Sequence, residues 1–104
     1  SRSRRNLFPV INDEKDLVGV ISLDDIRDII FNTELYYKTR ITEIMRTPPA
    51  ILSTGDSMEK VLEIFESTEA WNLPVAEEGK YIGFISRSKI FSAYRKLLKE
   101  FSDD

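Results

Sequence analysis

The chain has 104 residues and carries 18 acidic and 15 basic side chains, so its formal net charge is −3. A chain of this length buries roughly 60–70% of the surface that its unfolded state exposes, which is enough for one domain with one core. The sequence contains neither Cys nor His, which excludes zinc fingers, thiol nucleophiles and Ser-His-Asp chemistry. The mild acidity argues against a broad nucleic-acid-binding face, so we expect no nucleic-acid partner.

Two segments of the sequence can be laid over each other: NLFPVINDEKDLVGVISLDDI at residues 6–26 and NLPVAEEGKYIGFISRSKI at residues 72–90. They share Asn-Leu, Pro-Val, Gly-x-Ile-Ser and a later Ile, with an offset of 65 that becomes 64 across the turn. Such self-similarity indicates an internal repeat. Each copy predicts the same order of elements, namely strand, turn, strand and helix.

The first copy predicts a strand, a polar turn, a second strand and a helix, at residues 8–11, 12–16, 17–23 and 24–32. A helix is expected because Ile26, Ile29 and Ile30 recur at i, i+3 and i+4 and so form one apolar stripe. Ser22 and Asp25 have capping-box spacing at its start.

A different unit separates the two copies. Residues 32–40 are predicted to be a polar linker and residues 41–46 a turn of helix. The pair Pro48-Pro49 then forces an extended entry into a strand at residues 50–54. Asp56 has capping-box spacing for a helix that runs to about residue 68. The second copy ends in a longer helix with an apolar face made of Ile90, Phe91, Tyr94, Leu97, Leu98 and Phe101.

The chain therefore divides into a partial first repeat with its linker, residues 1–40, and a complete second repeat, residues 41–104. Only five residues precede Asn6, so the first repeat lacks the strand and helix that the second has at residues 50–68. We expect the chain to be a piece of a longer protein or its first module to be naturally short.

The tandem strand-helix-strand-strand-helix unit has FPVI or LPVA before a turn and Gly-x-Ile-Ser-x-x-Asp at a strand-to-helix junction. It resembles a CBS domain pair, or Bateman module, over nearly the whole chain. The resemblance implies an α/β (α+β) fold with two small sheets and flanking helices in a pseudo-twofold arrangement, its first repeat truncated. Residues 5–31 and the following ITEIMRTPP resemble, more narrowly, the C-terminal cytoplasmic region of ClC-type chloride channels and transporters.

The resemblance implies sensing of an adenine nucleotide (ATP, ADP or AMP) as a regulatory ligand, with no required cofactor and no metal. A helix N-terminus presents unpaired N–H groups and partial positive charge, which suit a phosphate. Ser22 would add a hydroxyl donor, Asp25 would accept hydrogen bonds from the ribose hydroxyls, and Gly19 would leave space for the facing backbone. By resemblance, the adenine would lie between two short segments, Pro49, Ala50 and Ile51 on one side and Leu73, Pro74 and Val75 on the other.

Simpler explanations fit the same residues. Ser is a common N-cap, Asp favours the first helical turn, and a strand Gly can serve close packing. The equivalent site in the second repeat has Lys89 where the first site has Asp25. A Lys side chain cannot accept a hydrogen bond from ribose. Lys89 and Arg87 are expected to form a solvated basic patch rather than to pair with a phosphate. We therefore expect at most one nucleotide site.

The resemblance further implies a regulatory module without enzyme activity, placed at the cytoplasmic face of the membrane, which modulates ion transport by a membrane-embedded channel domain of the same protein. Adjacent carboxylates such as Asp24 and Asp25 point in different directions, which argues against acid catalysis. Two copies are expected to associate as a homodimer through their helices. The alternatives are a ligand-free structural dimerisation module, and the regulatory CBS pair of a magnesium transporter or of a soluble nucleotide-regulated enzyme.

Overall fold

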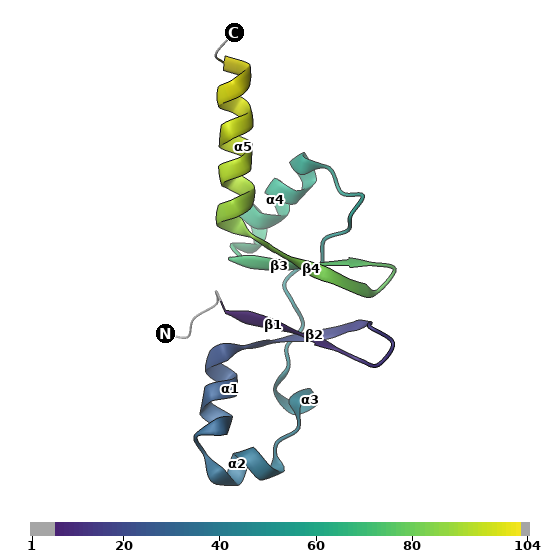
Figure 1. Cartoon of the computed structure of the whole chain (residues 1–104), viewed down its shortest axis with the longest axis vertical. Coiled ribbons are helices and arrows are strands. Elements are labelled where there is room, and N and C mark those ends of the chain that lie inside the picture. Colours follow the sequence, from purple (N-terminus) through teal and green to yellow (C-terminus); the bar gives the residue numbers. More distant parts are fainter. Residues whose placement is uncertain (1–5, 103–104) are drawn as a thin grey trace.

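The computed structural model describes residues 6–102. Its elements in chain order are β1 (Leu7–Ile11), β2 (Leu17–Ser22), α1 (Leu23–Ile30), α2 (Thr33–Lys38), α3 (Ile41–Ile44), α4 (Met58–Thr68), β3 (Asn72–Glu77), β4 (Lys80–Ser86) and α5 (Arg87–Ser102). The strands form two separate antiparallel sheets, β1-β2 and β3-β4. The sheets lie at the centre of an elongated molecule, with α1, α2 and α3 beyond one sheet and α4 and α5 beyond the other (Figure 1). The predicted mixed α/β architecture of two small sheets with flanking helices is confirmed.

The internal repeat is visible in the strand register. In the first sheet Val10 pairs with Gly19, and the register shifts directly after Val10. In the second sheet Val75 pairs with Gly83, and the register shifts directly after Val75. Both hairpins therefore carry an irregularity at the same place, and this kink of the strand is shared by the two repeats. The superposition of residues 6–26 on residues 72–90 is confirmed.

The strand predicted at residues 50–54 is reduced to a single bridge at Leu52. The Leu52 N–H donates to the Pro74 carbonyl at 2.8 Å, and the Leu52 carbonyl accepts from the Ala76 N–H at 2.9 Å. Directly after this bridge the Ser53 N–H donates to the Asp56 carboxylate at 2.9 Å. The chain turns at this point, so a second residue pair with β3 does not form.

Two further predictions are corrected at helix starts. Residues 32–40, predicted to be a linker, contain α2, because the Asn32 side chain accepts from the Leu35 N–H at 3.3 Å and caps a helix there. The cap of α4 is Ser57 and not Asp56, since the Ser57 hydroxyl accepts from the Lys60 N–H at 3.1 Å. The carboxylate of Asp56 is used by the preceding turn instead.

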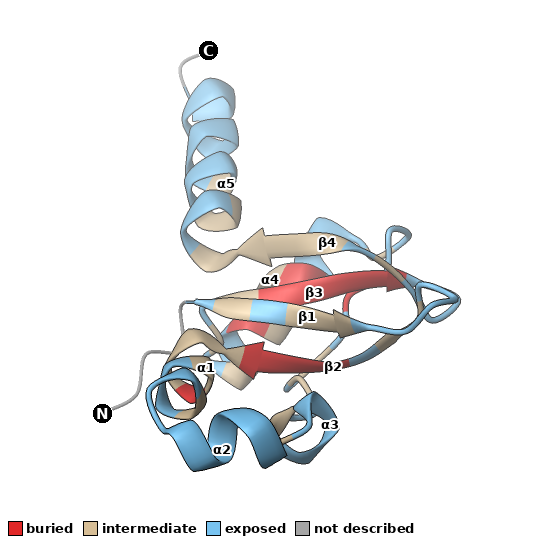
Figure 2. Cartoon of the chain, turned by 60° about the horizontal axis from the view of Figure 1, so that its bottom comes forward, coloured by how far each residue is buried: buried red, intermediate tan, exposed pale blue. Residues whose placement is uncertain are grey.

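The largest buried cluster lies in the second repeat, between β3 and α4, and consists of Leu52, Val61, Phe65, Leu73 and Val75. Figure 2 shows this buried layer along β3 and part of α4, and a smaller one on β2. On β2 the buried side chains are Val20 and Ile21. None of the helices within residues 6–102 is long and apolar enough to cross a membrane.

The two hairpins are joined at their turns. The Leu17 N–H donates to the Gly79 carbonyl, and the Tyr81 N–H donates to the Lys15 carbonyl, both at 2.9 Å. The Lys80 ammonium lies 2.7 Å from the Asp16 carboxylate. This ammonium and the Asn12 amide hold the pKa of the Asp16 carboxyl below its ordinary value. The turns thus form a clasp between the sheets, made of backbone hydrogen bonds and one ion pair.

We predict that the clasp weakens in acid. A carboxyl whose pKa is lower in the folded than in the unfolded protein stabilises the fold above its unfolded pKa, about 3.9 for Asp. This stabilisation is lost as the pH falls through the lower, folded pKa. The melting temperature should therefore fall as the pH is lowered below about 4, and Asp16→Asn should lower it at pH 7 and reduce this acid dependence. Asp13→Asn, with the same charge change in the same turn, is the control, and equal pH profiles of the two variants would contradict the prediction.

Candidate functional site

The site predicted at residues 19–25 is built around the start of α1. Ser22 has extended backbone angles, φ −88° and ψ 154°, and its hydroxyl accepts from the Asp25 N–H at 3.1 Å. This is the geometry of an N-cap, which satisfies one of the unpaired N–H groups of the first turn. Asp24 and Asp25 both lie in that turn, where a negative charge is favourable next to the helix dipole.

Asp25 is the buried charged residue of the part of the chain that the structure describes, with 9% of its surface exposed. Its Oδ2 atom lies 3.4 Å from the Nε atom of Arg46. Burial of a carboxylate is costly unless a cation or hydrogen bonds compensate it. The guanidinium of Arg46 therefore helps to compensate the charge of Asp25 at this position.

Arg46 reaches Asp25 because its backbone is attached to β2. The Val20 N–H donates to the Arg46 carbonyl and the Arg46 N–H donates to the Val20 carbonyl, both at 2.8 Å. A Cβ atom at the neighbouring Gly19 would lie 3.0 Å from the Met45 sulfur and 3.2 Å from the Arg46 carbonyl oxygen. The expectation that Gly19 leaves space for the facing backbone is confirmed, and that backbone belongs to Met45 and Arg46.

A cavity of about 440 Å³ opens beside Asp25, between α1 and the segment that contains α3. Its lining residues are Asp25, Asp28, Ile29, Glu43, Ile44, Met45 and Arg46. Neither Asp28 nor Arg46 is predicted from the sequence as part of the site. Asp28 could have been found, because it follows Asp25 by three positions and so lies on the same helical face. Arg46 could not, because only the tertiary contact with β2 brings it to Asp25.

The segments predicted to hold the adenine have a different environment. The chain at residues 49–51 runs from the first sheet to the second (Figure 1), and Ile51 is half exposed. Leu73, Pro74 and Val75 are buried on β3. None of these six residues lines the cavity beside Asp25. Val75 lines the cavity described next. The adenine contacts at these six positions remain a prediction.

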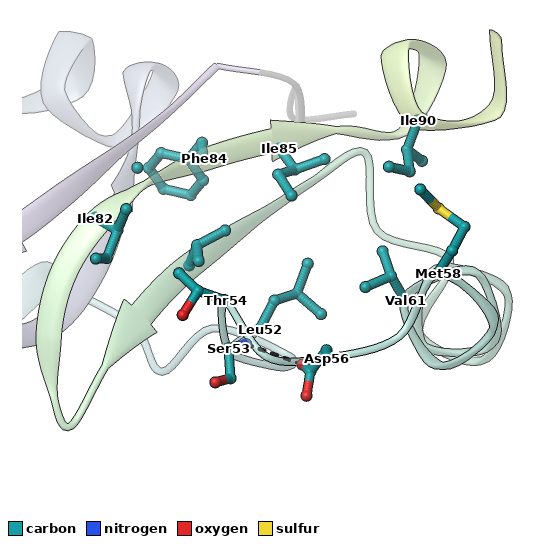
Figure 3. Close-up of a pocket in the computed structure, with 12 residues that line it drawn as sticks. Leu52, Ser53, Thr54, Asp56, Met58, Val61, Ile82, Phe84, Ile85 and Ile90 are labelled. Carbon is teal, nitrogen blue, oxygen red and sulfur yellow. Dashed lines mark hydrogen bonds between the residues drawn. The ribbon is translucent and has the colours of Figure 1, made fainter. Parts of the chain in front are cut away.

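A second cavity, of about 450 Å³, lies in the second repeat. Apolar side chains from β4, α4 and the first turn of α5 point into it, and Ser53, Thr54 and Asp56 lie at one side (Figure 3). Gly83, which corresponds to Gly19, borders this cavity, and a Cβ atom there would meet no atom within 4 Å. The two related strands therefore differ, since the first is covered by the chain at Met45 and Arg46.

The equivalent helix start in the second repeat is also capped by a serine, but the solvated basic patch predicted there is wrong. The Ser86 hydroxyl accepts from the Lys89 N–H at 3.1 Å, as Ser22 does from Asp25. Arg87 is not part of a solvated patch, because its guanidinium donates to the Phe65 carbonyl at 2.9 Å and the Ala70 carbonyl at 3.3 Å. It closes the C-terminal end of α4, a place where a cation is favourable.

Two sheets related by an internal repeat, each followed by a serine-capped helix, define the architecture of a CBS domain pair. The sequence profile of the CBS domain family matches residues 2–32 and 41–96, so the chain belongs to this family.

Solved structures agree with this assignment. A CBS domain protein from Streptococcus pneumoniae TIGR4 is 32% identical, with a TM-score of 0.70 over 89% of this chain and 66% of its own. CBSX2, solved in complex with AMP, is 27% identical, with a TM-score of 0.68 over 88% of this chain and 72% of its own. CbpB, solved in complex with c-di-AMP, is 26% identical, with a TM-score of 0.71 over 94% of this chain and 67% of its own. No curated protein sequence matches the chain.

We predict that Gly19→Ala is more harmful than Gly83→Ala. The added methyl group at position 19 meets a backbone carbonyl that is itself held on β2, so the strand or the crossing segment must shift. Overpacking of this kind costs about 1–3 kcal/mol, whereas the open position 83 should change the free energy of unfolding by about 0.5 kcal/mol or less. Urea denaturation of both variants measures this difference. Equal destabilisation would contradict the role assigned to Gly19.

Proposed function

We propose that the chain is a regulatory module without catalytic activity, which binds an adenine nucleotide at the start of α1. The observation that carries the proposal is Asp25, a buried acidic residue that borders a cavity one turn inside a capped helix. A buried carboxylate suits the two hydroxyls of a ribose, because hydrogen bonds to a charged acceptor are stronger than neutral ones.

Each part of the nucleotide has a proposed contact. The ribose hydroxyls donate to Asp25, and the phosphate lies near the first turn of α1 with Ser22 beside it. The adenine lies against the chain at residues 49–51 and the adjoining part of β3, as the family resemblance implies. The complexes of CBSX2 with AMP and of CbpB with c-di-AMP support an adenine-containing ligand, since both are similar to this chain over most of its length.

The narrower part of the proposal concerns the protein to which the module belongs. We propose the cytoplasmic region of a ClC-type chloride channel or transporter, with the module on the cytoplasmic face of the membrane and acting on the channel domain. The support is the resemblance of residues 5–31 and the following linker. The regulatory CBS pair of a magnesium transporter or of a soluble enzyme is the alternative, and the sequence upstream in the same gene separates them.

A second proposed function is homodimerisation through the helices. On α5, Leu97 and Leu98 are about half exposed and Phe101 is 71% exposed. At the opposite end of the molecule Phe31 and Tyr37 are also exposed. Exposed apolar side chains gathered on one face of a helix, as on α5, are typical of an interface. If no nucleotide binds, a purely structural dimerisation module is the function that these helices support.

The nucleotide proposal is tested by thermal-shift titration with AMP, ADP and ATP. A ligand that binds the folded state at 100 times its dissociation constant adds about 2.7 kcal/mol of stability, which is several degrees for a domain of this size. Asp25→Asn keeps the size of the side chain and removes its charge, so it should weaken binding about 10- to 100-fold.

Asp24→Asn is the matched control, because Asp24 is the adjacent residue of the same turn. Its Oδ1 atom lies 3.9 Å from the Nη1 atom of Arg27. This variant should not weaken binding, because Asp24 does not line the cavity beside Asp25. A wild-type protein whose melting temperature no adenine nucleotide changes, or an Asp25→Asn variant that responds like the wild type, would refute the proposed site.

The dimer is tested by placing a charge on the apolar face of α5. Leu98→Glu should shift the protein from dimer to monomer in light scattering after gel filtration, because burial of an unpaired carboxylate in an interface is unfavourable. Ser92→Glu makes the same charge change on the opposite face of α5 and should leave the dimer intact. A wild-type monomer at all accessible concentrations would contradict the proposal.

A further inference from the structure

The ion pair between Arg46 and Asp25 is asymmetric. The side chain of Asp25 is 11% exposed, whereas that of Arg46 is 67% exposed. The backbone of Arg46 is fixed on β2 by two hydrogen bonds of 2.8 Å. The guanidinium can therefore leave Asp25 by side-chain rotation alone, without a change in the fold.

The proposed nucleotide site needs the same carboxylate. Arg46 Nε faces the Oδ2 atom of Asp25 at 3.4 Å, and ribose hydroxyls that bind Asp25 compete for this atom. A ligand must displace the guanidinium of Arg46 and compensate for the lost attraction between Arg46 and Asp25. A nucleoside without phosphate offers no anion in exchange.

The charges around the cavity indicate where the displaced guanidinium goes. Among the described residues that line the cavity, Asp25, Asp28 and Glu43 carry carboxylates, and Arg46 carries a positive charge. A phosphate brought into these surroundings is repelled by the carboxylates and attracted by Arg46. Guanidinium and phosphate form paired, charge-assisted hydrogen bonds, which makes Arg the suitable side chain for this contact.

We infer that Arg46 is an exchange residue, which pairs with Asp25 in the free protein and turns to the phosphate of a bound nucleotide. Arg46 thereby sets the preference of the site for phosphorylated over unphosphorylated adenosine. The inference rests on the proposed nucleotide site at Asp25. When adenosine binds, the ion pair between Arg46 and Asp25 is lost. When AMP binds, an ion pair between Arg46 and the phosphate replaces it.

Calorimetric titration of the full chain with AMP and with adenosine tests this exchange. The wild type should bind AMP at least tenfold more tightly than adenosine. In Arg46→Met the affinity for AMP should fall about tenfold or more, while that for adenosine stays the same or rises, so the two dissociation constants come within about threefold of each other.

Arg46→Gln provides a second variant that keeps a hydrogen-bond donor for Asp25 and should show the same loss of preference, even if Arg46→Met does not fold. Arg27→Met is the control, because Arg27 is an exposed arginine on α1 and absent from the lining of the cavity. It should retain the preference of the wild type.

The outcomes separate this inference from the proposed site. If AMP binds the wild type and Asp25→Asn weakens it, but Arg46→Gln keeps the preference for AMP, the role of Arg46 is wrong and the site stands. If AMP and adenosine both bind Arg46→Gln more tightly than the wild type, and by the same factor, Arg46 only competes with the ligand for Asp25. The exchange is then refuted. If neither ligand binds the wild type, the proposed site fails and the inference with it.

Discussion

The crossing of the chain between the two sheets is the constraint on which the rest of the structure depends. An isolated two-stranded sheet is marginally stable at best, and each sheet here has two strands. The crossing segment adds a residue to both: Arg46 pairs with Val20 on β2, and Leu52 pairs with Val75 on β3. A single stretch of backbone, from residue 46 to residue 52, therefore extends both sheets and links them, and the clasp at the hairpin turns holds the same two sheets at another point.

The candidate site is a consequence of this crossing. Because β2 has Gly19 at the point of contact, the chain at Met45 can approach the strand closely. The approach places Arg46 opposite α1, where its guanidinium compensates the buried charge of Asp25. A ligand that binds Asp25 must change this ion pair, which is part of the contact between the linker and the first sheet. In the proposed site a ligand therefore acts on the ion pair between the linker and α1, and a regulatory role requires that the ligand bind one state of this contact more tightly than another.

Much of the fold could be predicted because the local signals and the repeat agree. The hairpins were found from alternating Pro-Val and Gly-x-Ile-Ser patterns that occur twice, and α1 from Ser22 together with its apolar stripe. The errors arose where several polar residues compete for one backbone group. Asp56 and Ser57 both can cap a helix, and only the turn at Ser53 decides which of them does so. The partner of Asp25 could not be predicted, because residues 25 and 46 meet through the tertiary contact of the linker with β2.

The difference between the two repeats shows how one scaffold carries different chemistry. Ser22 and Ser86 cap α1 and α5 with the same 3.1 Å hydrogen bond to the residue three positions later. That residue is Asp25 in the first repeat and Lys89 in the second, so an acceptor in one becomes a donor in the other. The first helix start is also enclosed by the crossing chain, which buries Asp25, whereas Lys89 is exposed. The repeated backbone therefore provides two equivalent helix starts, and the side chain at the fourth position together with its enclosure makes the first of them suited to a ribose.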